Sequence, residues 1–320
     1  MRLGFLGMPI FGRRRTSAPR LAPELDDAEL GRVRKHLTAP QVQGQLDLSA
    51  GLVEQLLRDT GTDWDLRTHR LAVLAEAASP GLAQVWRRQR PRDADPLVFQ
   101  VWAELAQARR DGAVEDPRGL LERCHRAADL VPADPTPWIA RLGALRLLSR
   151  PSEEVYPVCR EIGSRDPWNR AAHLEMLGYL SPAECGSHAQ ALDFVDAVRA
   201  AAPANSAVAG LELALLLERY RATLAAGGVT ALGARRRWTR PDAEAALERA
   251  LTWTLPGALS HAGAPADLNL LAYALVQAGR LREAATVFEV LGATVAPWPW
   301  ALDGEPLQQF EYWREQALTA

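Results

Sequence analysis

Proline residues return at an almost constant interval through the middle of this 320-residue chain. Pro132, Pro167 and Pro203 lie 35 and 36 residues apart, and each follows a segment in which apolar residues have helical spacing. Alternating Val/Ile/Thr runs and Asn-Gly turns, which mark strands and hairpins, are missing from the sequence. The pattern predicts an all-α protein built from helix pairs of similar length.

Helical periodicity extends over almost the whole chain, with Pro, Gly or Asp at most junctions. Before the segment 64–77, Asp63 is expected to act as an N-cap or first-turn acid rather than as half of a catalytic carboxylate pair with Asp65. We expect helices over 26–37, 48–58, 64–77, about 80–90, 95–111, 117–131, 136–148, 152–163, 168–180, 187–201, 205–223, 241–254, 266–278, 281–292 and 304–318.

The cysteines follow the same interval. Cys124 and Cys159 each lie eight residues before their proline, and Val195 has this place in the third unit. An equivalent position should face the partner helix, so both thiols are expected to be buried and unreactive. Three cysteines without a C-x-x-C pair do not indicate a disulfide framework, and they favour a reducing cytoplasm.

The clearest copy of the repeated unit lies at residues 267–292. Its matching positions are Leu268, Leu271, Ala272 and Leu275 in the first helix, Gly279 at the turn, and Ala284 and Phe288 in the second helix. This pattern resembles the tetratricopeptide repeat (TPR) family, whose unit is a pair of helices of about 34 residues. The unit 139–167 fits as well, with Leu142 and Gly143 as its close-packing pair.

The resemblance covers about residues 95–295, and the chain is also similar to uncharacterised actinobacterial TPR-like proteins. It implies a right-handed superhelical solenoid of helix hairpins that binds partners in a concave groove. Four parts are expected along the chain: a basic, flexible tail at 1–22, an N-terminal helical cap or divergent repeats at 23–92, TPR-like repeats at 93–296 with an insertion at about 224–240, and a C-terminal capping helix at 297–320. The alternative for the tail is an anchor that docks on a membrane or a partner.

Charge and hydropathy narrow the class of protein. The chain has 37 basic and 39 acidic residues, for a net charge of -2, so it lacks the overall basicity of a dedicated nucleic-acid binder but can still carry local basic patches. Lys35 is the only lysine, and the excess of Ala and Arg is typical of a GC-rich genome. No apolar run is long enough to predict a transmembrane helix, and a cytoplasmic location is expected.

Two clusters combine arginine with tryptophan. The candidate partner-binding residues are Arg87, Arg88 and Arg90 after Trp86, and Arg235, Arg236, Arg237 and Trp238 in the insertion. Guanidinium groups bind carboxylates and phosphates through paired hydrogen bonds, and arginine stacks on indole rings. These clusters could therefore clamp an acidic peptide or a nucleic-acid backbone; the alternative is a solvated helix end and a polar loop.

No nucleotide-binding P-loop, zinc-protease or hydrolase motif is present. His173, Glu175, Glu184, Cys185 and His188 lie close in sequence but are expected to serve packing and capping, with Ser187 as an N-cap. No catalytic residue, metal or cofactor is expected. The sequence favours a non-catalytic TPR-like scaffold or adaptor that binds a peptide or a protein. An acidic partner is one of those expected. The alternatives are a regulatory or nucleic-acid-associated protein and an enzyme on a helical solenoid.

Overall fold

The computed structural model describes residues 18–39 and 45–320, and within these ranges the chain is all-α, as predicted. The first half contains α1 (Ala28–Thr38), α2 (Gln45–Arg58), α3 (Trp64–Ala77), α4 (Leu82–Gln89), α5 (Asp95–Asp111), α6 (Pro117–Leu130), α7 (Thr136–Leu147), α8 (Ser152–Gly163) and α9 (Arg170–Tyr179). The second half contains α10 (His188–Ala201), α11 (Leu211–Ala225), α12 (Gly228–Leu232), η1 (Ala234–Thr239), α13 (Pro241–Leu251), η2 (Thr252–Thr254), α14 (Ala264–Gln277), α15 (Leu281–Leu291), α16 (Pro297–Trp300) and α17 (Pro306–Leu318), where η marks a short 3-10 helix.

Local sequence explains where these helices begin. The Asp63 carboxylate accepts a hydrogen bond from the backbone N–H of Leu66 at 3.0 Å, which confirms its predicted role as the N-cap of α3. Ser187 caps α10 in the same way, through Gln190 N at 3.2 Å. Proline stands in the first turn of α5, α6, α7, α13, α14 and α17, where its missing N–H has no helical partner to lose.

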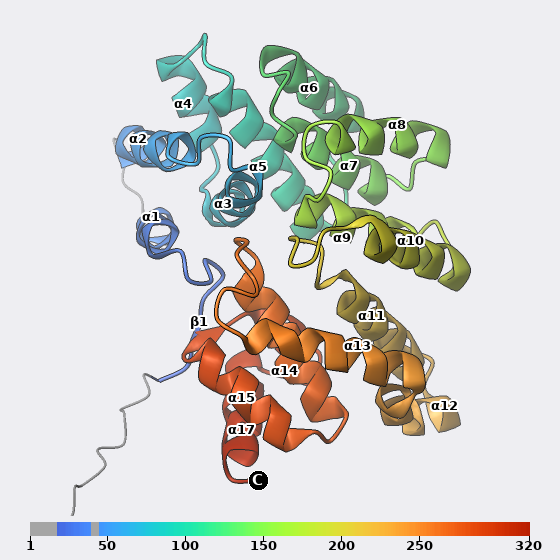
Figure 1. Ribbon diagram of the computed structural model, residues 1–320. Helices are drawn as coiled ribbons and strands as arrows, with labels where there is room; N and C mark the ends of the chain where they lie inside the picture. Colours follow the sequence, from blue (N-terminus) through green and yellow to red (C-terminus); the bar gives the residue numbers. More distant parts are fainter. Residues whose placement is uncertain (1–17, 40–44) are drawn as a thin grey trace, which may run out of the picture.

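The helices pack in an alternating order. Along one series, α1 contacts α3, α3 contacts α5, α5 contacts α7 and α7 contacts α9, while α2 packs on α4 and α6 and α8 both pack on α7 (Figure 1). Gly143 allows the close approach of α5 and α7, because a Cβ at this position would lie 2.9 Å from a methyl carbon of Leu105. The sequence predicts small residues at the crossing within a helix pair, whereas this close contact joins the first helices of two neighbouring pairs.

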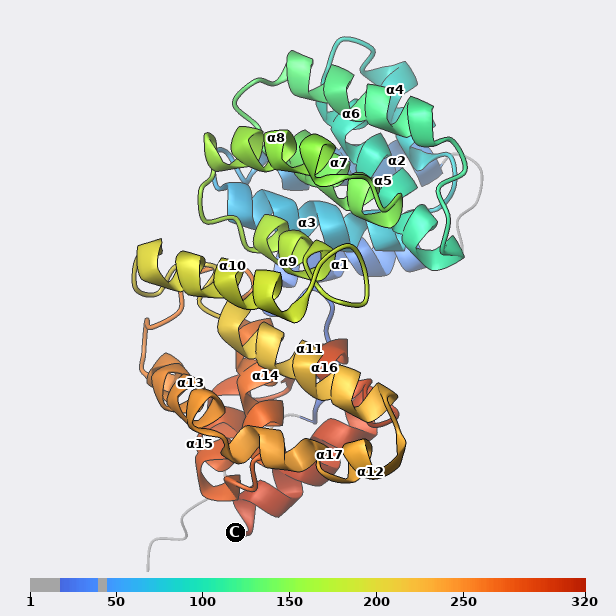
Figure 2. The same ribbon diagram turned by 90° about the vertical axis from the view of Figure 1, so that its right-hand side faces the viewer.

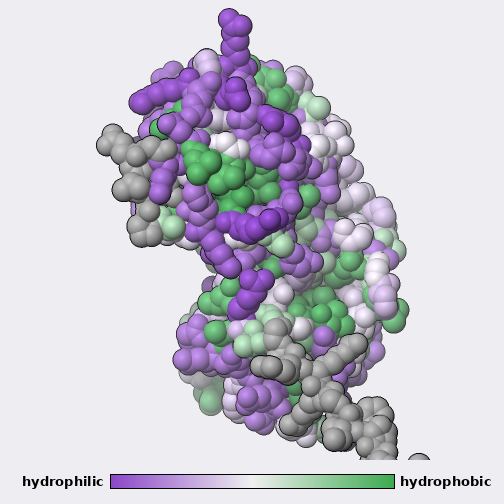
Figure 3. All heavy atoms as spheres, turned by 90° about the vertical axis from the view of Figure 1, so that its left-hand side faces the viewer, coloured by the Kyte–Doolittle hydropathy of each residue, from purple (hydrophilic) through white to green (hydrophobic). Residues whose placement is uncertain are grey.

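The chain is arranged in two parts that lie one above the other. Helices α1 to α9 form the upper part and α11 to α17 the lower part in Figure 2, with α10 beside the junction. Asp65 in α3 accepts a hydrogen bond from Ala262 N at 2.7 Å, and Arg170 in α9 pairs with the buried Asp267 of α14 at 2.5 Å. Figure 3 shows a hollow at the edge of one face, between the two parts.

Two short strands pair a segment near the N-terminal end of the described chain with a segment that follows α15. β1 (Arg20–Leu21) pairs in parallel with β2 (Thr294–Val295), and Ala22 N donates to Val295 O at 3.0 Å. The tail predicted over residues 1–22 therefore ends earlier than expected, because this pairing supplies backbone partners and buries Ala22 completely. Residues 1–17, which hold the proposed anchor, lie outside the described ranges.

The C-terminal helix α17 packs on the last helix pair. Phe310 of α17 is fully buried, with its ring 5.1 Å from Phe288 of α15 and 5.4 Å from Trp300 of α16. The indole N–H of Trp300 donates to Asn269 Oδ1 of α14 at 2.9 Å. None of the described helices combines the length and the hydropathy that crossing a membrane requires.

Candidate functional site

The first arginine cluster lies at the end of α4, and its tryptophan belongs to the core. α4 begins after Gly81, whose φ of 93° favours glycine, and it buries Leu82 and Trp86. Trp86 is fully buried, with its ring 5.8 Å from that of Phe99 on α5. The helix therefore turns its arginines to solvent while its indole is unavailable to a ligand. Arginine in the last turn is also favoured by the helix dipole.

These arginines line a groove of about 470 Å³ that α4 shares with α6. Its lining includes the three predicted residues Arg87, Arg88 and Arg90 and a fourth arginine, Arg126, which no sequence pattern marks. Asp93 is the only carboxylate in this lining. Four guanidinium groups against one carboxylate give the groove a local positive charge on a chain whose net charge is -2.

The four guanidinium groups differ in whether they already have a partner within the protein. Arg87 donates to Gln100 Oε1 at 2.8 Å, and Arg90 pairs with Glu54 Oε2 at 3.2 Å. Arg88 and Arg126 are exposed and make no hydrogen bond or ion pair with any residue in the ranges 18–39 and 45–320. They can therefore engage a carboxylate or phosphate without first breaking an internal contact.

A second hollow of about 350 Å³ lies along α6, and Arg126 lines both hollows. This second part is of mixed charge, because Glu122 and Asp129 join Arg118 and Arg141 in its lining. Arg118 is already paired with Glu122 at 3.2 Å. The strongly basic part is therefore limited to the α4 side.

The second predicted cluster forms η1, in the expected insertion between α11 and α13, far from α4 in Figure 1. Trp238 is 1% exposed and packs 5.7 Å from Tyr220, so its predicted role as a binding residue at the surface is not supported by its position. Arg235 and Arg236 are exposed, whereas Arg237 is half-buried. The structure does not bring the two arginine clusters together.

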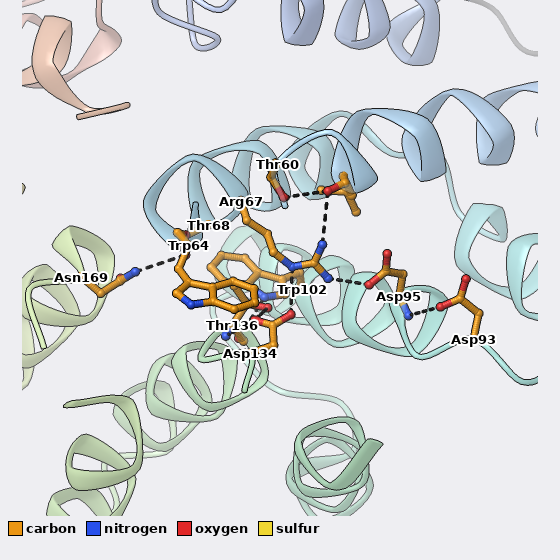
Figure 4. A network of polar contacts seen from close by, with 11 residues as sticks. Thr60, Trp64, Arg67, Thr68, Asp93, Asp95, Trp102, Asp134, Thr136 and Asn169 are labelled. Carbon is orange, nitrogen blue, oxygen red and sulfur yellow. Dashed lines mark hydrogen bonds and ion pairs between the residues drawn. The ribbon is translucent and has the colours of Figure 1, made fainter. Parts of the chain in front are cut away.

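A buried polar network below α3 has a structural role (Figure 4). Arg67 donates to Asp134 at 2.8 Å and to Asp95 at 2.5 Å, and Asp134 also accepts hydrogen bonds from the backbone N–H and the hydroxyl of Thr136 at 2.7 and 2.6 Å. The Trp102 indole N–H donates to the Thr136 carbonyl at 3.1 Å. These contacts satisfy the buried charges within the protein, so the network joins helices and offers no open binding position.

Three of the five residues considered as metal ligands make other contacts. Arg146 pairs with Glu175 at 3.0 Å and with Glu184 at 2.5 Å, while the ring of His173 stacks between those of Trp168 and Phe194 at 6.2 and 5.9 Å. Burial lowers the pKa of His173, because the charged imidazolium would lose hydration there. Within the described ranges, no group of three or more His, Cys, Asp or Glu side chains is arranged to hold a metal ion.

The repeat interval predicts that two thiols are buried, and the structure buries Cys124 fully and Cys159 in part. Cys124 is 1% exposed in the core, and Cys159 is partly buried with its Sγ 3.6 Å from the sulfur of Met176. Burial raises the pKa of Cys124 to about 12 and that of Cys159 to about 11. Neither thiol has the lowered pKa of a nucleophile.

Comparisons of this chain with protein-family models, with curated proteins and with solved structures found no match.

Proposed function

We propose that the protein is a non-catalytic adaptor, built as a right-handed solenoid of TPR-like helix hairpins, that binds an acidic segment of a partner protein. The solenoid is supported by the alternating order of helix contacts, in which each hairpin packs on its neighbours, and by the interval of 35 and 36 residues between prolines. A stack of this kind positions side chains from successive hairpins along one surface, as an extended ligand requires.

The observation that carries the binding proposal is the groove of Arg87, Arg88, Arg90 and Arg126. Planar guanidinium groups match carboxylates with paired hydrogen bonds, and two of the four have no partner of their own within the described chain. The groove is lined by α4 and α6 together, so it depends on the helix packing and is more than a solvated helix end.

The outer groove is favoured over a concave inner face by the contacts of α3. This helix contacts both α7 and α9, and Asn169 Nδ2 donates to Thr68 Oγ1 at 3.3 Å across the inner side. Helices that meet each other in this way leave no room between them for a partner segment in that part of the stack.

Nucleic-acid binding has less support as an alternative. This alternative relies on the two clusters of arginine around Trp86 and Trp238, and both indoles are buried, so neither can stack on a base. Without an exposed aromatic surface beside the arginines, the groove offers charge alone, which an acidic protein segment satisfies equally well.

The test is fluorescence anisotropy with a labelled Glu-rich peptide as the probe. The double variant Arg88→Glu/Arg126→Glu should weaken peptide binding by about tenfold or more, because attraction becomes repulsion at both free guanidinium positions. The matched control is Arg160→Glu/Arg282→Glu, which makes the same change in net charge at two exposed arginines without partners among the described residues. The control should bind the peptide within about twofold of the wild type.

Circular dichroism melts should show a small and similar decrease in melting temperature for both double variants, because all four positions are at the surface and each variant places one glutamate in the last turn of a helix. Equal peptide binding by the two variants would refute the groove as the binding site. Tighter binding of single-stranded DNA than of the peptide, lost in Arg88→Glu/Arg126→Glu, would instead support the nucleic-acid alternative and refute the acidic-protein proposal.

A further inference from the structure

The insertion between α11 and α13 exposes apolar side chains at the surface. Val229 and Leu232 on α12 are each 86% exposed, and Leu224 at the end of α11 is 37% exposed. Val229 and Leu232 are three residues apart, so they share one face of their helical turn. Single exposed aliphatic residues are ordinary, but two almost fully exposed ones on a five-residue helix form a small apolar tip.

This tip is held in place by the core. Ala234 and Trp238, immediately after α12, are 1% exposed, and η1 packs against α11, α13 and α14. The Trp238 ring lies 5.7 Å from that of Tyr220 on α11. Because the buried indole fixes the base of the insertion, the apolar tip is held at the molecular surface. In Figures 1 and 2, α12 lies at the outer edge of the lower part of the molecule.

Beside the tip in sequence and in the packing of η1 lie arginines that have few acidic partners among the described residues. Arg219 lies 3.8 Å from Asp242, a distance that gives a weak ion pair, and Arg240 is exposed without a partner within the described ranges. Nη1 of Arg237 is buried and has no hydrogen-bond acceptor there. Burial, together with the nearby charges of Arg219 and Arg240, lowers the pKa of Arg237. A buried charged donor without an acceptor is costly, and an anion bound at the exposed part of the same half-buried guanidinium would compensate its charge.

We propose that residues 224–240 form a docking site for an anionic phospholipid surface. In this arrangement, Val229 and Leu232 enter the boundary between headgroups and acyl chains, and Arg237 and Arg240 donate hydrogen bonds to headgroup phosphates. The exposed Arg235 and Arg236 add charge attraction at the same surface. Both features of the lipid surface are needed. The headgroup phosphates accept hydrogen bonds from the arginines, and the boundary of the acyl chains accommodates the two aliphatic side chains.

A membrane surface fits this tip better than a protein interface does. A stable protein interface buries about 800 Å² on each partner and is built around a packed centre. The five-residue helix α12 offers only two large aliphatic side chains at a projecting edge. Shallow insertion of an apolar edge flanked by basic residues is the usual geometry of a protein that lies on a membrane.

The experiment is vesicle flotation of the full chain, with vesicles of phosphatidylcholine alone and of phosphatidylcholine mixed with phosphatidylglycerol. Arg237→Gln/Arg240→Gln should lower the partition coefficient on the anionic vesicles by about 25-fold, because each arginine near such a surface contributes about fivefold. Val229→Ser/Leu232→Ser should lower it by about tenfold or more.

Two matched controls are available on other helices. Arg160→Gln/Arg282→Gln removes two exposed arginines elsewhere, and Val290→Ser changes an aliphatic residue that is 49% exposed on α15. Both controls should partition within about twofold of the wild type, since these positions lie away from the insertion. Added salt should weaken the wild-type interaction by screening its charge component.

A separate measurement distinguishes headgroup phosphate from soluble phosphate. Isothermal titration with inorganic pyrophosphate should give much weaker binding than the anionic vesicles, because it lacks the apolar boundary. Tight pyrophosphate binding without flotation would overturn the membrane proposal, as would flotation that is the same on neutral and anionic vesicles, or the same for the tip variants and the controls. Because this site is separate from the α4–α6 groove, Arg88→Glu/Arg126→Glu should still float with the anionic vesicles.

Discussion

Replacing Arg67 with methionine tests how much the buried network contributes to stability. Arg67 is 5% exposed and joins Asp134, which is 3% exposed, to Asp95 through contacts of 2.8 and 2.5 Å. Methionine keeps much of the side-chain volume but leaves the Asp134 carboxylate buried without its cation. Breaking a buried ion pair from one side costs about 3–5 kcal/mol, much more than losing a surface pair.

The expected loss can be measured by urea unfolding, followed by tryptophan fluorescence, and by thermal melts. At this chain size, about 3–5 kcal/mol corresponds to a decrease in melting temperature of about 5–15 °C. Arg118→Met is the matched control, because its side chain is 91% exposed and Glu122, itself exposed, is its only ion-pair partner among the residues that the structure describes. Losing that pair should cost at most about 0.5 kcal/mol.

A second variant separates the stranded charge from a general packing defect. Arg67→Met/Asp134→Asn removes the buried charge as well as its cation, so it should recover part of the stability lost in Arg67→Met. A loss below about 1 kcal/mol in Arg67→Met would refute the reasoning, because it would mean that the Asp134 charge is relieved without the guanidinium.

Two further predictions concern thiols and pH. In the native protein, Ellman's reagent should modify the exposed Cys185 first, Cys159 slowly and Cys124 only on unfolding, because burial raises the pKa of the latter two to about 11 and about 12; equal rates for all three would contradict this. Burial lowers the pKa of His69, so its contribution to stability is complete above about pH 6.5 and is lost as the pH falls below that value. The free energy of unfolding should therefore depend less on pH between about 7 and 5 in His69→Gln than in the wild type, and identical slopes would exclude this histidine as the cause.

Predictions based on short-range patterns agree with the structure. Asp63 and Ser187 cap the helices that follow them, and Gly143 lies where two helices approach closely. The helical periodicity at the C-terminus corresponds to α17, which buries Phe310. Each of these features depends on one or two turns of helix or on the spacing of small and large residues, which the sequence displays directly.

The binding residues could be predicted only in part. Arg87, Arg88 and Arg90 were selected because they adjoin Trp86, yet the structure buries that indole and completes the groove with Arg126 instead. Nothing near Arg126 in the sequence marks it, because its relation to α4 arises from the packing of the two helices. The position of Trp238 could not be predicted for the same reason, since its burial depends on contact with Tyr220 of α11.

The sequence by itself determined that the chain is helical, where most helices begin, and which positions are small enough for close packing. These properties follow from caps, periodicity and residue volume, which act between neighbours in the chain. Only the tertiary structure decided which charges are buried. Arg67 and Asp134 are 67 residues apart in sequence and form a buried pair, whereas Arg88 and Arg126 are left without partners in the described chain. Desolvation depends on which helices meet, and so the tertiary structure separates the arginines that stabilise the fold from those that remain available to bind.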